Sequence, residues 1–262
     1  MRYRASKTLT LATVFAGALV LAQGASAGRV ILSGDEWPLS DYGFAVAPAS
    51  TATFAQNLAS YMNTDGGACN LLVYSSHFRL TGSSLNAALS GAGCSVTYSI
   101  GAFDLGTLSG YDGVLLGGLQ YNYSASILTS YVDSGHSVYI AAGTGEVANE
   151  HLIWDSFIHS YGLDLGPSYN GILGLLPISG GSPLFTGVTE LYYDNGNSVS
   201  AFGNDPNTQI IASLGSDGLF GVYADSPRVV ATGDPNAIPE PTTLALLGIG
   251  VAALGLRRRR AY

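Results

Sequence analysis

The strongest constraint on the fold is an alternation of short apolar runs with longer amphipathic segments between residues 30 and 161. Each apolar run is about five residues long, which suits a strand that is buried on both faces. The intervening segments repeat their apolar residues with the 3.6-residue period of a helix. The predicted strands lie at 30–34, 70–74, 95–100, within 108–118 and at 137–142, and the predicted helices at 51–62, 81–89, 124–134 and 150–161.

Strands and helices that alternate in this way predict an α/β fold with an open, mostly parallel sheet and helices on both faces. The pattern weakens after Gly162, where short β-like segments replace the helices. We expect this small additional β region to extend the sheet at one edge or to form a small antiparallel lobe. Its predicted strands are 190–193, 198–202, 209–213, 218–223 and 228–232.

The first 27 residues have the three parts of a secretory signal peptide. Arg2, Arg4 and Lys7 make a basic start, an apolar run covers 9–22, and Ala25-Ser26-Ala27 forms a small-x-small cleavage site. We expect cleavage after this triplet and export of the chain. An uncleaved anchor helix is the alternative, although the apolar run is short for one.

The chain ends in a proline motif, an uncharged run and a block of arginines. The motif is Pro239, Glu240 and Pro241, the run covers 242–256, and the block is Arg257, Arg258, Arg259 and Arg260. As a hydrophobic helix the run would span about 22 Å at about 1.5 Å per residue, less than the ~30 Å hydrocarbon core. It would therefore insert with local thinning of the bilayer. The arginines would hold that end in the cytoplasm and leave the folded domain outside.

This arrangement over residues 238–262 resembles the PEP-CTERM sorting signal of exopolysaccharide-producing Gram-negative bacteria. The resemblance implies recognition by an exosortase, a membrane cysteine protease that cuts near the proline motif and releases or re-anchors the protein at the cell surface. It implies membrane anchoring by the hydrophobic helix before processing. An ordinary C-terminal membrane anchor is the alternative. The resemblance implies a route and a processing enzyme, and carries no activity of its own.

Residues 28–237 form one acidic domain between these two ends. The basic residues there are Arg29, Arg79 and Arg228, with no lysine. Of the 18 acidic residues of the chain only Glu240 lies outside this domain, so 17 remain and the net charge is −14. A field of this sign repels nucleic acid and anionic lipid and favours cations. Solubility after export is the simpler explanation of the acidity.

Cys69 and Cys94 are the two cysteines of the chain, and both lie in the acidic domain. An even pair in an oxidising compartment predicts a disulfide. Each cysteine directly precedes a predicted strand, so both can lie at the same edge of the sheet. The alternative is two buried free thiols, and neither cysteine has the spacing of a metal site.

The order of elements is similar to that of the class I glutamine amidotransferase-like, or flavodoxin-like, fold. The segments that carry this resemblance are 111–116, 127–140, 182–188 and 228–234. Catalytic members of that family have a nucleophilic cysteine on a strained turn after the strand that corresponds to 137–140. The matching position here is Ala141, and no segment matches the His/Glu pair that would activate a cysteine. The resemblance therefore implies the fold and argues against that chemistry.

The segment Gly143-Thr144-Gly145-Glu146 follows the fifth predicted strand, at the edge where open α/β sheets bind ligands. Thr144 would need an adjacent base to act as a nucleophile, and Glu146, His151 and His159 are the candidates. None of them has a diagnostic spacing, and a glycine-rich turn between strand and helix is the simpler interpretation. The segment is no phosphate loop, because it lacks a lysine and the acidic domain repels phosphate.

Asp35 and Glu36 follow the first predicted strand and therefore face the same edge as Glu146. Carboxylates held about 5–10 Å apart can perform acid–base catalysis, as in glycoside hydrolysis. They can instead bind Ca²⁺, which takes oxygen ligands, or form a solvated rim. The histidines show no ligand pattern, so we expect no metal centre and no obligatory cofactor.

Together these features predict an exported protein of the cell surface or the exopolysaccharide matrix, with a non-catalytic domain. The expected partners are signal peptidase, an exosortase-type protease and exopolysaccharide, to which tyrosines offer flat apolar faces. The alternative is an extracellular hydrolase of polysaccharide or another matrix component that uses Asp35, Glu36 and Glu146. Carboxylates buried together in a cleft would favour the hydrolase, and carboxylates splayed on an open rim would favour the non-catalytic domain.

Overall fold

The computed structural model describes residues 28–64, 66–77, 79–118, 123–146 and 149–224. The strands are β1 Arg29–Ser33, β2 Cys69–Tyr74, β3 Cys94–Tyr98, β4 Gly113–Gly117, β5 Ser137–Ala141, β6 Leu163–Tyr169, β7 Leu173–Pro177, β8 Glu190–Asp194, β9 Asn197–Ala201, β10 Thr208–Leu214 and β11 Asp217–Ala224. The α-helices are α1 Asp41–Val46, α2 Pro48–Met62, α3 Ser83–Gly91, α4 Leu105–Leu108, α5 Ala125–Asp133 and α6 Glu150–Ile158. Short 3₁₀ helices cover Trp37–Leu39, His159–Tyr161 and Pro183–Phe185.

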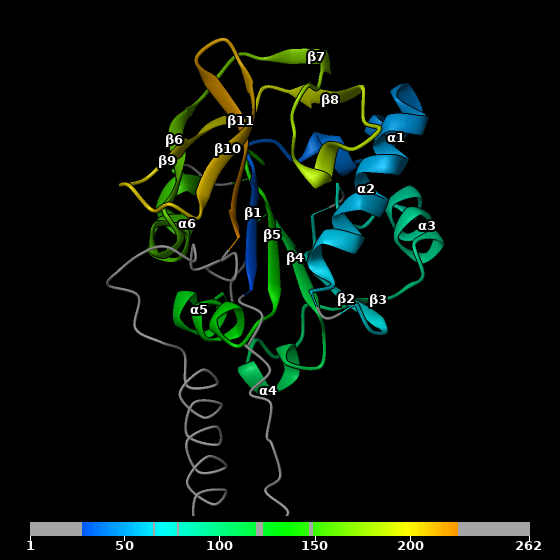
Figure 1. The fold of residues 1–262 in the computed structure, drawn as a ribbon, viewed down its shortest axis with the longest axis vertical. Coiled ribbons are helices and arrows are strands. Elements are labelled where there is room, and N and C mark those ends of the chain that lie inside the picture. The colour runs from blue at the N-terminus through cyan, green and yellow to red at the C-terminus, as the bar shows by residue number, and fades with distance from the viewer. Residues whose placement is uncertain (1–27, 65, 78, 119–122, 147–148, 225–262) are drawn as a thin grey trace, which may run out of the picture. The chain divides into compact units, whose positions relative to one another are not determined.

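One large sheet runs through the described part of the chain, in the order β3-β2-β4-β5-β1-β11-β9-β6, with β10 paired to β11 (Figure 1). The strands from β3 to β1 are parallel to their neighbours, and those from β11 onward pair antiparallel. A separate two-stranded ladder joins β7 and β8. The predicted α/β architecture is confirmed, and both expectations for the later β segments hold: they extend one edge and also add a small antiparallel ladder.

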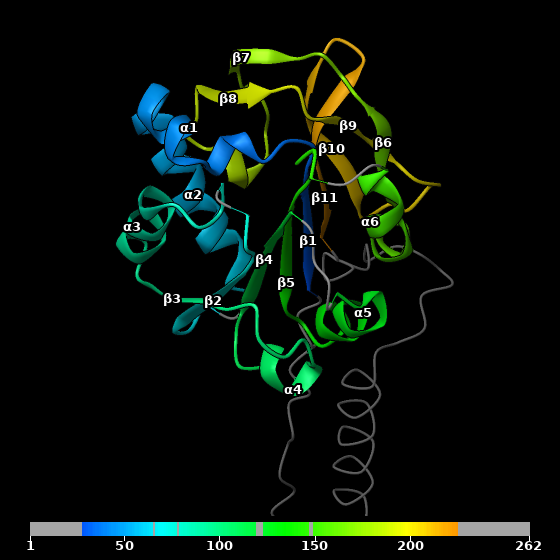
Figure 2. The ribbon, with the colours of Figure 1, turned by 180° about the vertical axis from the view of Figure 1, so that it is seen from behind.

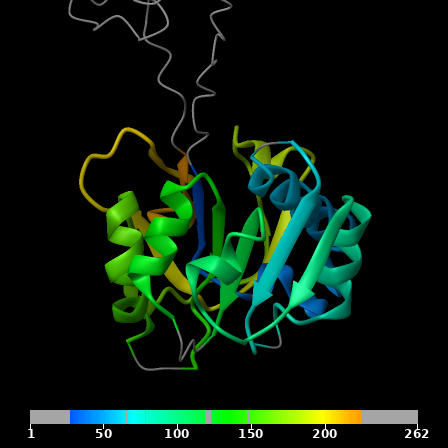
Figure 3. The same ribbon diagram turned by 90° about the horizontal axis from the view of Figure 1, so that it is seen from below.

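Two hydrophobic cores flank the parallel strands, because successive side chains of a strand point to opposite faces. On one face Ile31, Val73 and Leu115 pack with α2 and α3. On the other face Leu32, Leu116 and Ile140 pack with α4, α5 and α6. Figures 2 and 3 show these two helical layers on either side of the sheet. Burial on both sides explains why the strands read as continuous apolar runs.

The structure adds elements that the sequence pattern did not predict. Helix α1 is only six residues long, and residues 163–169 and 173–177 form strands β6 and β7. Strands β6 and β7 contain glycine, proline and alternating polar residues, which are poor strand formers. Pairing with strands distant in sequence overrides that local preference.

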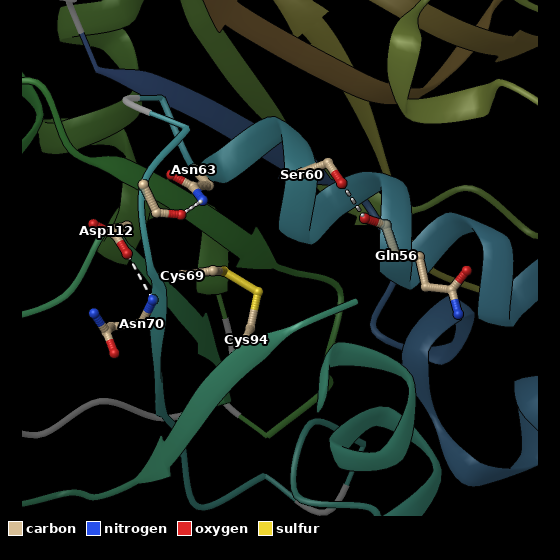
Figure 4. Close-up of a disulfide and its surroundings, with 8 residues drawn as sticks. Gln56, Ser60, Asn63, Cys69, Asn70, Cys94 and Asp112 are labelled. Carbon is tan, nitrogen blue, oxygen red and sulfur yellow. Dashed lines mark hydrogen bonds between the residues drawn. A yellow bond between two sulfur atoms is a disulfide. The ribbon is translucent and has the colours of Figure 1, made fainter. Parts of the chain in front are cut away.

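A disulfide joins Cys69 to Cys94, as predicted (Figure 4). The two cysteines are register partners at the start of the parallel pair β2–β3, and their Cα atoms lie 4.5 Å apart. Strand β3 is the edge of the sheet and is mostly exposed after Cys94. The disulfide therefore fixes the first residue of a strand that, within the described part of the chain, pairs on one side only.

Several predicted segments lie outside the described residues: the signal peptide 1–27, the strand 228–232 and the tail 238–262 with its hydrophobic helix 242–256. Among the residues that the structure does describe, no helix combines the length and apolar character needed to cross a membrane.

Candidate functional site: the carboxyl edge of the parallel strands

In two pairs of neighbouring parallel strands, the segments that follow the two strands lead to helices on opposite faces of the sheet. The chain leaves β2 toward α3 and leaves β4 toward α5, and these two helices pack on different faces. Neighbours β5 and β1 diverge in the same way, toward α6 and α2. In open α/β sheets a ligand crevice forms where connections diverge, outside the carboxyl ends of the strands. The residues after β1, β2, β4 and β5 are therefore the place to look for a site.

The crevice between β1 and β5 is closed by backbone. Gly143 has a φ of +73°, and a Cβ there would lie 2.3 Å from the carbonyl oxygen of Gly34 and 2.9 Å from the Cα of Gly196. Asn197 N also donates to the Gly34 carbonyl at 2.7 Å. The glycine-rich segment after β5 is thus needed for close packing against the turn between β8 and β9.

Asp35 is an internal acceptor for that same turn. Its Oδ1 accepts from Trp37 N at 2.7 Å, and its Oδ2 accepts from Asp194 N at 2.8 Å and Gly196 N at 3.1 Å. The side chain is fully buried, and burial raises its pKa to about 6 against the opposing effect of the three donors. Both carboxylate oxygens are therefore occupied by backbone groups, and Asp35 has a structural role.

Glu36 points into a different environment from its neighbour. It is 3% exposed, its Oε1 lies 3.8 Å from Arg79 Nε, and its Oε2 is buried without a hydrogen-bond partner among the described residues. Burial, and then the charge of Asp35, raise the pKa of Glu36 to about 8, although Arg79 opposes this. The carboxyl group is therefore held largely neutral at pH 7.

Arg79 is the cation at the centre of this edge. Its guanidinium stacks on the Trp37 ring, with Cζ 3.6 Å from the ring centroid. Glu36, Asp194, Asp35 and Glu146 all interact with it electrostatically. One guanidinium therefore faces four acidic groups. Acidic side chains outnumber basic ones at this edge, as they do in the whole domain.

His77 and Glu146 meet at the crevice between β2 and β4. His77 Nε2 lies 3.6 Å from Glu146 Oε1, which is an ion-pair distance and too long for a direct hydrogen bond. His77 Nδ1 accepts weakly from Arg79 N at 3.4 Å, so in the neutral ring Nε2 carries the hydrogen and points it at the carboxylate. Burial lowers the pKa of His77, with Glu146 opposing. Burial therefore favours the neutral form of the ring, and Glu146 favours the charged form.

Two local features hold His77 in place. Ser75 Oγ accepts from His77 N at 3.0 Å and donates to the Gly117 carbonyl at 2.6 Å, so it bridges the ends of β2 and β4. Gly118 has a φ of +74°, and a Cβ there would lie 2.8 Å from His77 Cβ and 2.5 Å from Glu146 Oε2. Glycine at this position leaves the space that the His77–Glu146 pair occupies.

Thr144 is bound by a glutamate that the sequence did not single out. Its N and Oγ1 both donate to Glu150 Oε2, at 2.8 and 2.9 Å, and Glu150 Oε1 accepts from Trp154 Nε1 at 3.2 Å. Burial raises the pKa of Glu150, while the three donors oppose this. The predicted bases do not take this role: Glu146 faces His77, His159 lies at the other end of α6, and His151 Nδ1 has no hydrogen-bond partner among the described residues.

A cavity of about 280 Å³ adjoins this group and is lined by Gly145, Asn149, Glu150, Pro167, Ser168, Tyr169 and Asn197. A larger cavity of about 480 Å³ lies near Tyr61 and the end of β11. Its lining contains no acidic, basic or histidine side chain. Of these two cavities, the smaller one is the one with a carboxylate, that of Glu150, in its lining.

The structure brings most of the predicted residues to one edge, in the different roles described above. Sequence reasoning missed His77, Arg79 and Glu150. His77 and Arg79 follow β2 at the same edge as Asp35, and Arg79 is one of only three basic residues in the acidic domain, which was a usable signal. No pattern in the sequence marked the pairing of Thr144 with Glu150.

Comparison with known proteins identifies the C-terminal tail. The family model of the PEP-CTERM protein-sorting motif matches residues 237–260, which lie outside the described residues. A search of curated proteins found no match. The motif implies processing by an exosortase-type enzyme, with export and membrane transit before display at the cell surface. The glutamine amidotransferase-like resemblance gains no support from these comparisons.

Proposed function

We propose that residues 28–237 form a non-catalytic domain displayed at the cell surface or held in the exopolysaccharide matrix. The sorting motif supports this location. The observation that carries the non-catalytic role is that Asp35 and Thr144, two of the candidate catalytic groups, are already engaged in hydrogen bonds within the fold. Asp35 accepts three backbone hydrogen bonds, Thr144 donates to Glu150, and Ala141 offers no nucleophile. Both oxygens of Asp35 are therefore engaged within the fold.

An aromatic cluster beside the same edge supports polysaccharide as the partner. Trp37, Tyr42 and Tyr192 meet edge to face, with ring centroids 4.7 to 5.9 Å apart. Tyr42 is 50% exposed, and Arg79 packs on the Trp37 ring. Aromatic rings combine a flat apolar face with a polar edge, which suits the apolar faces and hydroxyls of sugars. The proposed ligand is therefore a neutral or weakly charged glycan of the matrix.

A polysaccharide hydrolase is the second candidate, and one observation favours it. Glu36 is buried and largely neutral at pH 7, as a general acid must be. Glu146 is 37% exposed and so available as a carboxylate base. In this candidate Glu36 would protonate the leaving oxygen and Glu146 would activate water.

A single experiment separates the two candidates. The full chain is incubated with exopolysaccharide isolated from the producing cells, and co-sedimentation and new reducing ends are both measured. We expect co-sedimentation without new reducing ends. Tyr42→Ala should lower the bound fraction several-fold, whereas Phe202→Ala, which removes a similarly exposed aromatic ring directly after β9, should bind as the wild type does.

The outcome that supports the hydrolase is equally specific. New reducing ends that disappear in both Glu36→Gln and Glu146→Gln would replace the non-catalytic proposal with the second candidate. If the chain neither binds nor cleaves this polysaccharide, both candidates are rejected as stated.

A further inference from the structure

Three side chains with metal-binding atoms converge where α6 ends and β6 begins. They are Asp155, His159 and Asp164, and their ligand atoms all lie within 4.8 Å of one another. His159 Nε2 lies 2.8 Å from Asp164 Oδ1 and 3.7 Å from Asp155 Oδ1. Each residue is partly buried, so an ion can reach the group from solvent.

The local fold creates this group from residues close in sequence. Asp155 and His159 are four apart, so they share a face at the end of α6. Gly162, with a φ of +67°, ends the following 3₁₀ helix and turns the chain into β6, which returns Asp164 to the same place. The group is separate from the sheet-edge residues, since Glu150 lies at the opposite end of α6.

Neighbouring side chains hold the three residues in position. The His159 ring stacks on Phe202 with centroids 3.8 Å apart and planes 6° from parallel. Ser200 Oγ donates to Asp164 Oδ2 at 3.2 Å, which leaves Oδ1 to face the imidazole. Partners of this kind orient the ligands in metal sites.

A simple ion pair accounts for only part of this geometry. The 2.8 Å contact between His159 and Asp164 is a normal hydrogen bond. Asp155 Oδ1, however, is shielded from solvent and has no hydrogen-bond donor among the described residues. A buried acceptor without a donor is costly, and a cation at this point would satisfy it.

The two separations at His159 lie on either side of the value expected around a small divalent cation. Donors about 2.0–2.1 Å from a tetrahedral Zn²⁺ lie about 3.3 Å from one another, between the two distances at His159. Two carboxylates balance the ionic charge, and the imidazole favours a first-row transition ion over Ca²⁺ or Mg²⁺. We propose that Asp155, His159 and Asp164 bind one such ion, with Zn²⁺ as its probe and water completing the coordination. No metal-site spacing in the sequence indicates this group, because the turn from α6 into β6 is what brings Asp164 to the other two residues.

Calorimetric titration tests the site directly. The full chain, without a histidine tag and stripped of metal by a chelator, is titrated with Zn²⁺ and in parallel with Ca²⁺. We expect one Zn²⁺ per chain and weaker or absent binding of Ca²⁺ at this site. His159→Gln and Asp164→Asn should each lower the Zn²⁺ affinity at least about tenfold. His151→Gln, on the same helix, is the matched control and should bind as the wild type does.

X-ray absorption of the Zn²⁺-loaded wild type keeps the test decisive if a variant fails to fold. We expect one imidazole and otherwise oxygen ligands. The proposal is overturned if the wild type binds no Zn²⁺, if His159→Gln binds it as tightly, or if the metal shell contains sulfur or lacks imidazole. These outcomes do not depend on whether the chain binds or cleaves polysaccharide.

Discussion

At the scale of single residues, two adjacent carboxyl groups at the sheet edge differ in their properties because their surroundings differ. Asp35 and Glu36 are neighbours and both are buried. Three backbone donors stabilise the charge of Asp35, whereas the second oxygen of Glu36 has no donor among the described residues. Burial without donors disfavours the charged form, so Glu36 has the higher pKa of the two.

This difference predicts how stability depends on pH. Glu36 has a pKa of about 8 when folded and 4.5 as the reference value, so between these pH values the folded chain holds a proton that the unfolded chain lacks. Its contribution to stability is therefore complete below pH 4.5 and is lost as pH rises through 8, at up to about 1.4 kcal/mol per pH unit. Asp35 acts in the same direction, but only up to about pH 6.

We expect Glu36→Gln to remove this dependence between pH 6 and 8. Urea unfolding of wild type and variant across that range measures it, and the difference in unfolding free energy should favour the variant increasingly as pH rises. Parallel curves for the two proteins would show that Glu36 ionises normally in the folded chain.

Gly118 gives a second prediction at this scale. Alanine there would adopt an unfavourable positive φ and place its Cβ against His77 Cβ, which is close to the backbone and cannot move aside. We expect Gly118→Ala to destabilise by about 1–2 kcal/mol through backbone strain and by about 1–3 kcal/mol more through overpacking. Gly203→Ala, at a φ of +75° with nothing within 4 Å, isolates the backbone term. Equal losses in urea unfolding would argue against a packed His77–Glu146 pair.

At the scale of elements, the edge strand β3 depends on its covalent link to β2. Most of β3 after Cys94 is exposed, so burial contributes little to its position. The disulfide closes a loop with a sequence separation of 25 residues. It constrains the unfolded chain and keeps β3 in register with β2, its one neighbour among the strands that the structure describes.

We expect the double variant Cys69→Ser, Cys94→Ser to lose about 3–4 kcal/mol of unfolding free energy in the chain-entropy model. Urea unfolding with and without a reductant measures it. The reductant should destabilise the wild type by a similar amount and leave the double variant unchanged. A wild-type transition that ignores complete reduction would show that the disulfide contributes nothing to stability.

At the scale of the whole molecule, an acidic exported domain is joined to a tail with a sorting motif. The domain carries almost no basic residues, so its negative charge disfavours contact with anionic lipid. The sorting tail combines an uncharged run with a cationic end, which suits a membrane-embedded processing enzyme.

Mass spectrometry of protein recovered from the native cell surface tests this organisation. We expect an N-terminus at Gly28, a C-terminus near Pro239-Glu240-Pro241, and oxidised cysteines. Replacing the three motif residues by alanine should block the C-terminal cut and leave the N-terminal cut intact. An intact chain in the cytosol, with its leader attached and both thiols reduced, would contradict the export route.

The sequence alone determined the local elements of the parallel sheet, the cysteine pairing and the C-terminal motif. The strands and helices are recognisable because each is a continuous run of residues. Strands such as Leu71–Val73 are apolar because both faces are covered, and helices repeat their apolar residues every turn. Strands β6 and β7 escaped prediction because pairing partners, rather than local propensity, hold them extended.

Only the tertiary structure decided what the polar residues do. Asp35 was correctly placed at the carboxyl edge, but its three donors come from residues as far away in sequence as Gly196. The same holds for Glu36 with Arg79 and for His77 with Glu146, whose separation in sequence gives no hint of contact. Hydrogen bonds and pKa shifts depend on distances of a few ångströms and on burial, and a linear pattern records neither.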